Sequence, residues 1–158
     1  MLKAHTRNRS GRVTLRSRDP TDPPSIDFGY FDLKDDPEER DLRAVVAGIK
    51  FARRLVAPLV ESRTIAEEEV PGRSTETDAQ LAKFVREHAW GHHACGTCAI
   101  GPRAENGVLG SDFRVHGVAN LRVVDASVFP RIPGYFIVSA VYMIGEKAAD
   151  AILADAMG

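Results

Sequence analysis

The segment from Ile137 to Ala154 most constrains how this chain can fold, because it is apolar around much of its girth. Its spacing predicts one long helix, on which Glu146, Lys147 and Asp150 mark the solvated side. A helix that is apolar on its remaining sides must be covered by other protein. One small domain offers too little surface for this, so the sequence predicts that the chain alone exposes an apolar patch.

The bulk composition excludes several classes of protein. With 158 residues, 44% of them hydrophobic and 27% charged, the chain resembles one globular domain with a real core. A net charge of −1 gives no general attraction to nucleic acid, and no apolar run approaches the ~20 residues of a membrane span. Cys95 and Cys98 form no disulfide framework, so we expect a reducing compartment and hence the cytoplasm.

The first long helix has start and stop signals. Asp36 is expected as its N-cap, with Pro37 at the first helical position and Glu39 closing a capping box. Pro58 is expected to end it. Between these signals apolar residues recur at helical spacing, namely Leu42, Val45, Val46, Ile49, Ala52 and Val56.

Shorter elements surround this helix. Residues 11–16 alternate as a half-buried strand does, and residues 26–33 favour a short extended segment. A second helix is expected from Thr75 or Thr77, and residues 121–124 predict a strand covered on both faces. The face of that second helix would carry Leu81, Phe84, Val85 and His88. We expect an α+β fold with a mostly antiparallel sheet and helices packed on it.

The segment from His92 to Cys98 holds two of the five histidines and both cysteines. A zinc site would need a second ligand pair from a separate segment, and no such Cys/His pair exists. A redox Cys-x-x-Cys needs a helix that opens at the first cysteine, and Gly96-Thr97 starts a helix poorly. We therefore expect no metal and interpret the thiols as small buried apolar groups, which leaves a histidine as the working group.

Three segments in order carry a family resemblance. They are His93-x-x-Gly96-Thr97, the stretch Asp112–Pro130, which contains Asn120-Leu121-Arg122-Val123-Val124-Asp125-Ala126-Ser127, and Tyr142–Asp150. Their order and spacing resemble the carboxy-terminal domain of the glucose–methanol–choline oxidoreductases, which are flavoenzymes that oxidise alcohols. The resemblance covers most of residues 90–153.

The resemblance implies roles for particular residues. His93 would be the general base that takes the hydroxyl proton of an alcohol substrate, since a histidine titrates near neutral pH. The second proton-carrying position of the family falls on Phe136, which cannot exchange a proton; an alignment shifted by one residue would place Tyr135 there instead. FAD would be contacted by His92, His93, Asp125, Ala126, Phe136 and Ile137.

The same resemblance implies a division of the chain. Residues 1–106 would belong to the substrate domain, and residues 107–158 would form a strand and helix that complete an FAD-binding domain. The Gly-x-Gly-x-x-Gly fingerprint that holds the FAD pyrophosphate is absent, because none of the 13 glycines lies two residues from another. We therefore expect an amino-terminal FAD-binding half or subunit as partner, and no FAD binding by the chain alone. The alternative is a non-catalytic fragment or remnant of such an enzyme.

Overall fold

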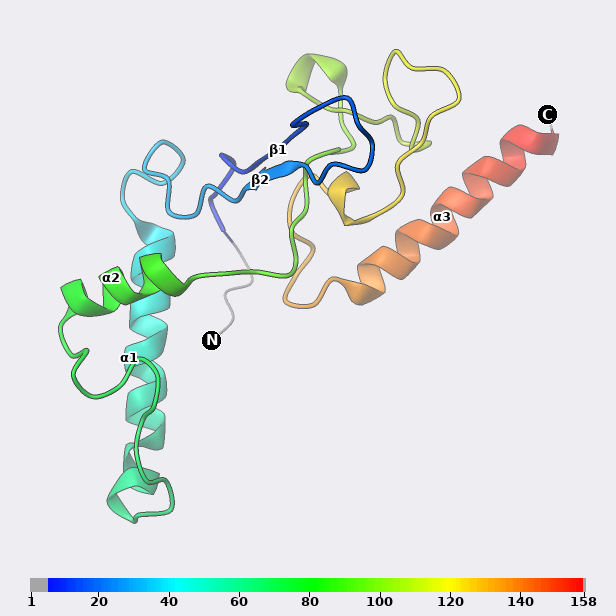
Figure 1. The fold of residues 1–158 in the computed structure, drawn as a ribbon. Helices are drawn as coiled ribbons and strands as arrows, with labels where there is room; N and C mark the ends of the chain where they lie inside the picture. The colour runs from blue at the N-terminus through cyan, green and yellow to red at the C-terminus, as the bar shows by residue number, and fades with distance from the viewer. Residues whose placement is uncertain (1–5, 158) are drawn as a thin grey trace. The chain divides into compact units, whose positions relative to one another are not determined.

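The computed structural model describes residues 6–157, which contain three α-helices and one two-stranded antiparallel sheet (Figure 1). The chain divides into two compact units, a first unit that ends at Trp90 and a second unit that begins at Gly91. Residues 1–5 and Gly158, which the expected division also included, lie outside the described residues. The α+β class is confirmed, but the sheet is much smaller than expected.

The sheet belongs to the first unit. Strands β1 (Arg12–Thr14) and β2 (Ser25–Asp27) run antiparallel, with Val13 opposite Ile26. The strand predicted within residues 11–16 forms as β1, but its expected half-burial is wrong, because every residue of both strands is exposed. A two-stranded ribbon needs a further layer to bury one face, and among the described residues of the first unit no layer buries either strand.

Helix α1 (Arg40–Glu61) begins later than the sequence signals predicted. Glu39 is the N-cap residue but has a left-handed backbone with φ of 52°, and its own N–H donates to the Asp36 carbonyl at 2.9 Å. The residues after Asp36 therefore form a turn rather than the first helical turn. Asp36 still supports the helix, because its carboxylate accepts the Asp41 N–H at 2.7 Å.

The end of α1 also differs from the prediction. Pro58 lies inside the helix, which continues to Glu61. A proline removes one N–H donor from the helical ladder, and this loss is small when the helix ends within a turn of it. The Pro58 carbonyl still accepts the Ser62 N–H at 3.0 Å, so the last turn closes normally.

Helix α2 (Asp78–His88) lies against α1 within the first unit. Of the two predicted starts, Thr75 and Thr77, the structure has Thr77 as the N-cap. Its side chain accepts the Gln80 N–H at 3.2 Å and the Gln80 side chain accepts the Thr77 N–H at 2.9 Å, which is a capping box. The core between the two helices consists of Leu42, Val46, Leu81 and Val85. Four of the predicted helix-face residues therefore meet in one cluster.

The second unit is built mainly from loops around one helix, α3 (Val138–Met157). Its core is Leu109, Phe113, Val128 and Ala148. The prediction of a strand at residues 121–124 is wrong. Within the second unit, this segment pairs with the rest of the chain through one isolated bridge, between Arg114 and Arg122. A lone bridge cannot hold a strand, and Leu121 and Val124 are exposed rather than covered.

Helix α3 confirms the predicted carboxy-terminal helix with its bounds moved by one residue at the start and three at the end. It is tied to the core of the second unit through Ala148. Many of its apolar side chains are exposed, as the sequence predicted: Val138, Tyr142, Met143, Ile152, Leu153 and Met157. Within residues 6–157, no helix combines the length and apolarity needed to span a membrane.

Candidate active site

Two loops of the second unit are joined through one carbonyl group. The Ser127 carbonyl accepts the N–H of Gly96 at 3.1 Å and the N–H of Cys98 at 3.0 Å. Two residues further, the N–H of Ile100 donates to the Val128 carbonyl at 2.9 Å. These main-chain bonds bring the loop that carries His92 and His93 alongside the turn that follows Asp125.

That turn is a 3₁₀ helix at Ala126–Val128, and Asp125 is its N-cap. The Asp125 carboxylate accepts the Ser127 N–H at 2.8 Å and also the Ser127 hydroxyl. Val128 anchors the turn, because its side chain is fully buried in the core of the second unit. Asp125 and Ala126, both expected to contact a cofactor, thus lie at the start of a turn that hydrogen bonds and burial hold in place.

His93 lies between two other rings. Its ring centroid is 6.2 Å from that of Phe136, with the ring planes at 70°, and 6.2 Å from that of His92, with the planes at 48°. His93 is half-buried, whereas His92 and Phe136 are exposed. The structure therefore brings together three of the predicted site residues, with an edge-to-face contact at the position expected to oppose the base.

The turn before α3 completes this group. Gly134 has φ of 138°, a backbone conformation that side-chain-bearing residues rarely adopt, and it redirects the chain toward Tyr135 and Phe136. Tyr135 is exposed and Ile137 is buried. Ile137 could therefore meet a cofactor only through its main chain.

The two thiols follow His93 in the same loop. Cys95 and Cys98 are free and half-buried, and Cys98 packs against the core that contains Leu109 and Val128. Burial raises the pKa of the Cys95 thiol, which keeps it protonated at neutral pH. Among the described residues, no group of three or more His, Cys, Asp or Glu side chains could hold a metal ion.

An ion-pair group in the second unit was not predicted. The Asp155 carboxylate, in the last turn of α3, accepts hydrogen bonds from the guanidinium groups of Arg114 and Arg122. These hydrogen bonds lower the pKa of Asp155 and raise that of Arg114. Asp155 lies 41 residues from Arg114 and 33 from Arg122, and no local pattern marked them as partners.

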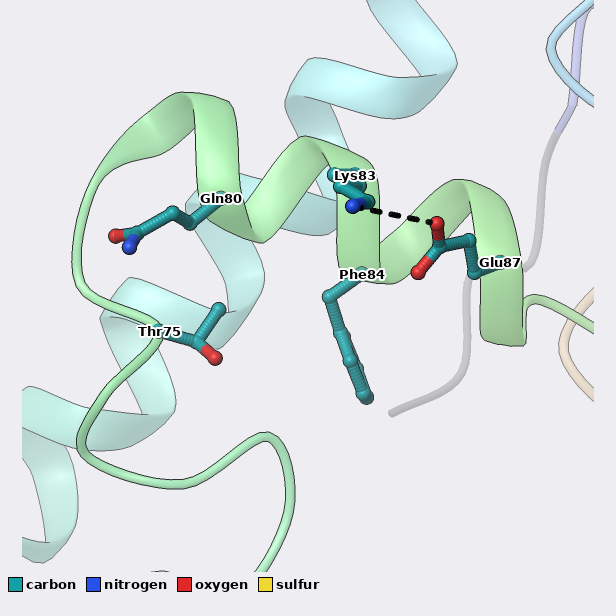
Figure 2. A pocket seen from close by; sticks show the side chains of 5 residues that line it. All are labelled: Thr75, Gln80, Lys83, Phe84 and Glu87. Carbon is teal, nitrogen blue, oxygen red and sulfur yellow. Dashed lines mark ion pairs between the residues drawn. The ribbon is translucent and has the colours of Figure 1, made fainter.

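Two surface hollows of the first unit share no residue with the histidine site. Figure 2 shows one of about 210 Å³ beside α2, lined by Thr75, Gln80, Lys83, Phe84 and Glu87, with the ion pair Lys83–Glu87 at 3.9 Å. A second hollow of about 450 Å³ lies between α1 and α2. Neither is lined by a residue that the sequence predicted for the site.

Comparison with solved structures shows which class of protein has this fold. The chain is similar to a formate oxidase from Aspergillus oryzae in a structure that concerns its FAD modification, with a TM-score of 0.78 and 33% identity over 92% of this chain and 25% of that one. It is also similar to a fungal aryl-alcohol oxidase, with a TM-score of 0.72 and 34% identity over 94% of this chain and 24% of that one. Both neighbours are oxidases.

Sequence comparison gives the particular family. The chain is 42% identical over 144 residues to the oxygen-dependent choline dehydrogenase of Citrobacter koseri, covering 90% of this chain and 25% of that protein. It is 41% identical over 150 residues to the choline oxidase of Arthrobacter globiformis, covering 94% of this chain and 27% of that protein. A family model described as GMC oxidoreductase matches residues 6–145. The chain therefore belongs to the GMC oxidoreductase family, and it spans about a quarter of the length of these curated relatives.

Proposed function

We propose that this chain forms the carboxy-terminal, base-bearing part of an FAD-dependent oxidoreductase that acts on the CH–OH group of an alcohol. The observation that carries the proposal is the placement of His93, on a loop bonded to the Ser127 carbonyl and in ring contact with Phe136. Family membership supports the reaction class, as do relatives named choline dehydrogenase and choline oxidase. FAD is supported by the formate oxidase neighbour.

In this proposal His93 accepts the hydroxyl proton of the alcohol. As the proton leaves, negative charge develops on the oxygen and weakens the adjacent C–H bond, so the base is needed as that bond breaks. Bound FAD would supply the acceptor for the hydride that departs from this carbon. Phe136 has no group that exchanges a proton, so within this ring contact the proton transfer falls to the imidazole.

The residues of the site fit the flat ring system of FAD. The rings of His92, His93 and Phe136 form a group with aromatic surface exposed, and the small side chain of Ala126 would let the main chain approach closely. Nothing in this group suits a pyrophosphate, which is usually held by a glycine-rich turn at a helix N-terminus.

We therefore propose an amino-terminal FAD-binding half, in the same chain or in a partner subunit. Residues 107–158 would return to that half, while residues 1–106 would belong to the substrate domain and join a larger antiparallel sheet. The exposed apolar side chains of α3, such as Tyr142 and Met143, are surface that this half could cover. The free thiols are consistent with the cytoplasm as the location.

A non-catalytic role is the second candidate. The observation that favours it is Phe136 itself, because a residue without a transferable proton opposes the histidine. In this case the chain would retain the fold of the family and lack its reaction.

Replacing His93 separates the two candidates. In the chain assembled with an amino-terminal FAD-binding half, His93→Ala should lower the rate of alcohol oxidation by ~10²-fold or more, while FAD content stays nearly unchanged. His88→Ala is the matched control, because His88 is exposed on α2 and stacks on Phe84 in the first unit. A His93→Ala rate within a few-fold of wild type would move the base elsewhere, and His92→Ala would be tested next.

Titration with FAD tests the cofactor proposal. The purified chain alone should be colourless in the flavin absorption band and should not bind FAD at micromolar concentration, because only contacts to the ring system are available. Addition of the amino-terminal half should produce flavin-loaded protein. A yellow chain would contradict the proposed partner, and a loaded but inactive assembly would favour the non-catalytic role.

A further inference from the structure

The larger surface hollow of the first unit, about 450 Å³ in volume, lies between α1 and α2, the two helices that pack together there (Figure 1). Its floor is apolar, because it includes the core residue Val46 and the small side chains of Ala47 and Ala82. None of these side chains donates or accepts a hydrogen bond, so an occupant gains by burying apolar groups against them. An occupant should therefore present an apolar side to the hollow.

One wall of the hollow is basic. Arg43, Lys50 and Arg54 line it, and they follow one another on α1 at spacings of seven and four residues, which places them on one face of the helix. The guanidinium of Arg54 also lies over the ring of Phe51, 5.9 Å from its centroid. These three cations form what we call the basic face of the hollow.

The acidic residues that line the hollow already have partners. The Asp78 carboxylate accepts a hydrogen bond from the Lys50 ammonium at 2.7 Å, and Glu39 forms an ion pair with Arg86. Within residues 6–157, neither arginine of the basic face has a carboxylate within ion-pair distance. Two positive charges beside the apolar floor are therefore available to a partner.

The spacing of these two arginines defines a complementary surface. Arg43 and Arg54 lie eleven residues apart on α1, which is three helical turns and a rise of about 16 Å. A second helix with two acidic residues three turns apart on one face would match both charges. Apolar residues between those acids would then face the hollow, as in other complexes in which a helix binds in a groove.

The helices of this chain do not carry that pattern. Within residues 6–157, no α-helix has two acidic residues eleven positions apart. In α2, Asp78 and Glu87 are nine residues apart and so lie on opposite faces, and in α3, Glu146 and Asp150 are one turn apart. A helix of a second copy of this chain therefore does not match the basic face.

We propose that the hollow between α1 and α2 binds an amphipathic helix of a partner protein. That helix would carry two acidic residues three turns apart, which pair with Arg43 and Arg54, and apolar residues between them, which enter the hollow. This docking surface shares no residue with the histidine site, so it is independent of the proposed reaction.

The test follows binding of a labelled helical peptide to the full chain by fluorescence anisotropy. The peptide has 18 residues, mostly alanine and glutamine, with glutamate at positions 3 and 14 and leucine at positions 7, 10 and 11. We expect saturable binding that weakens in high salt, because exposed ion pairs are screened. A peptide with glutamine in place of both glutamates, or with the second glutamate moved to position 12 on the opposite face, should bind about 3-fold to 30-fold more weakly.

Substitutions in the chain test the same contacts from the other side. Arg43→Ala and Arg54→Ala should each weaken binding by about 2-fold to 5-fold. Ala47→Leu should weaken binding as well, because the larger side chain occupies the hollow. Arg18→Ala is the matched control, since Arg18 is exposed in the first unit and does not line the hollow. Circular dichroism verifies that each variant remains folded.

The outcomes decide the proposal. No binding, equal binding of the glutamate and glutamine peptides, or an equal loss in Arg18→Ala and Arg43→Ala would overturn it. The titration is then repeated on the chain assembled with its FAD-binding half. Unchanged affinity would support a partner protein, whereas loss of binding would show that the half itself covers the hollow and would also overturn the proposal.

Discussion

The two units of the chain are held together in different ways. In the first unit, two helices pack side by side through Leu42, Val46, Leu81 and Val85, all at helical spacing. In the second unit, the core residues Leu109 and Phe113 come from loops and Val128 from a short 3₁₀ turn, and only Ala148 comes from an α-helix. The proposed site lies in the second kind of structure.

The difference shows what each construction supplies. A helix satisfies its own main-chain groups, so the first unit needs only apolar contact between two elements. The second unit must satisfy its main chain across loops, as the Ser127 and Val128 carbonyls do for Gly96, Cys98 and Ile100. Main-chain hydrogen bonds between loops hold the irregular segment that carries His93 in place.

The largest effect on stability should come from truncating one buried leucine in each core. Leu81 and Leu109 are both 0% exposed, so Leu→Ala at either should lower the free energy of unfolding of its own unit by about 2–5 kcal/mol. Urea denaturation measures the loss, and hydrogen exchange locates it. Leu109→Ala should speed exchange at the amides of Gly96 and Cys98, whereas Leu81→Ala should act on α1 and α2. Equal loosening of both units by either variant would show that they fold as one.

A smaller effect is expected from the thiols, which only the second unit contains. Replacing Cys98 and Cys95 together by Ala should cost about 1 kcal/mol of stability through lost packing, most of it at Cys98, which contacts the core. Activity per folded molecule should not change. Unfolding curves and kinetics on the flavin-loaded assembly measure the two quantities. Stoichiometric zinc or iron in protein purified without added metal would contradict a purely structural role.

The smallest effect compares one carboxylate from each unit. The pKa of Asp35 is lowered mainly by hydrogen bonds from the Ser10 hydroxyl and the Arg9 N–H, and that of Asp155 by the charged groups of Arg114 and Arg122. A lowered pKa in the folded state means that each stabilises the fold above the ordinary value of 3.8, and that this stabilisation is lost as the pH falls through the lowered value.

Salt should distinguish these two carboxylates. Added salt screens the ion pairs of Asp155 and affects the uncharged donors of Asp35 far less. Acid titrations of unfolding for Asp155→Asn and Asp35→Asn, at low and high salt, give the comparison. The difference between wild type and Asp155→Asn should shrink in high salt, and that for Asp35→Asn should persist. The same salt response for both would refute the assigned causes.

The sequence predicted the features that depend on neighbours along the chain. The helix start near Thr77 was predicted from a local signal, and the buried pair Leu81 and Val85 from a spacing of four residues. The start of α1 was wrong because Glu39 adopts a left-handed backbone, a turn geometry that the Asp36 signal does not encode. Local signals thus predict both helices and the start of α2, and miss the turn that precedes α1.

The candidate site was predicted by residue identity rather than by geometry. The family resemblance selected His93 and Phe136, and the structure brings their rings to 6.2 Å. The bonds that hold their loops join main-chain atoms about 30 residues apart, such as Gly96 and Ser127, and no side-chain pattern announces such a bond. The prediction of a strand at residues 121–124 was wrong for a related reason. A strand is stabilised by a neighbouring strand from elsewhere in the chain, and the residues of the segment itself do not show whether that neighbour exists.

The two hydrogen bonds to the Ser127 carbonyl also determine which substitutions can test how the histidine loop is held. Both bonds are made by backbone atoms, so changing the side chain at residues 98 or 127 leaves the acceptor and both donors in place. Alanine scanning would therefore pass over the atoms that fix the histidine loop. Replacing the peptide N–H of Gly96 or Cys98 by an ester oxygen removes one donor at a time, and semisynthesis of the second unit is the way to reach it.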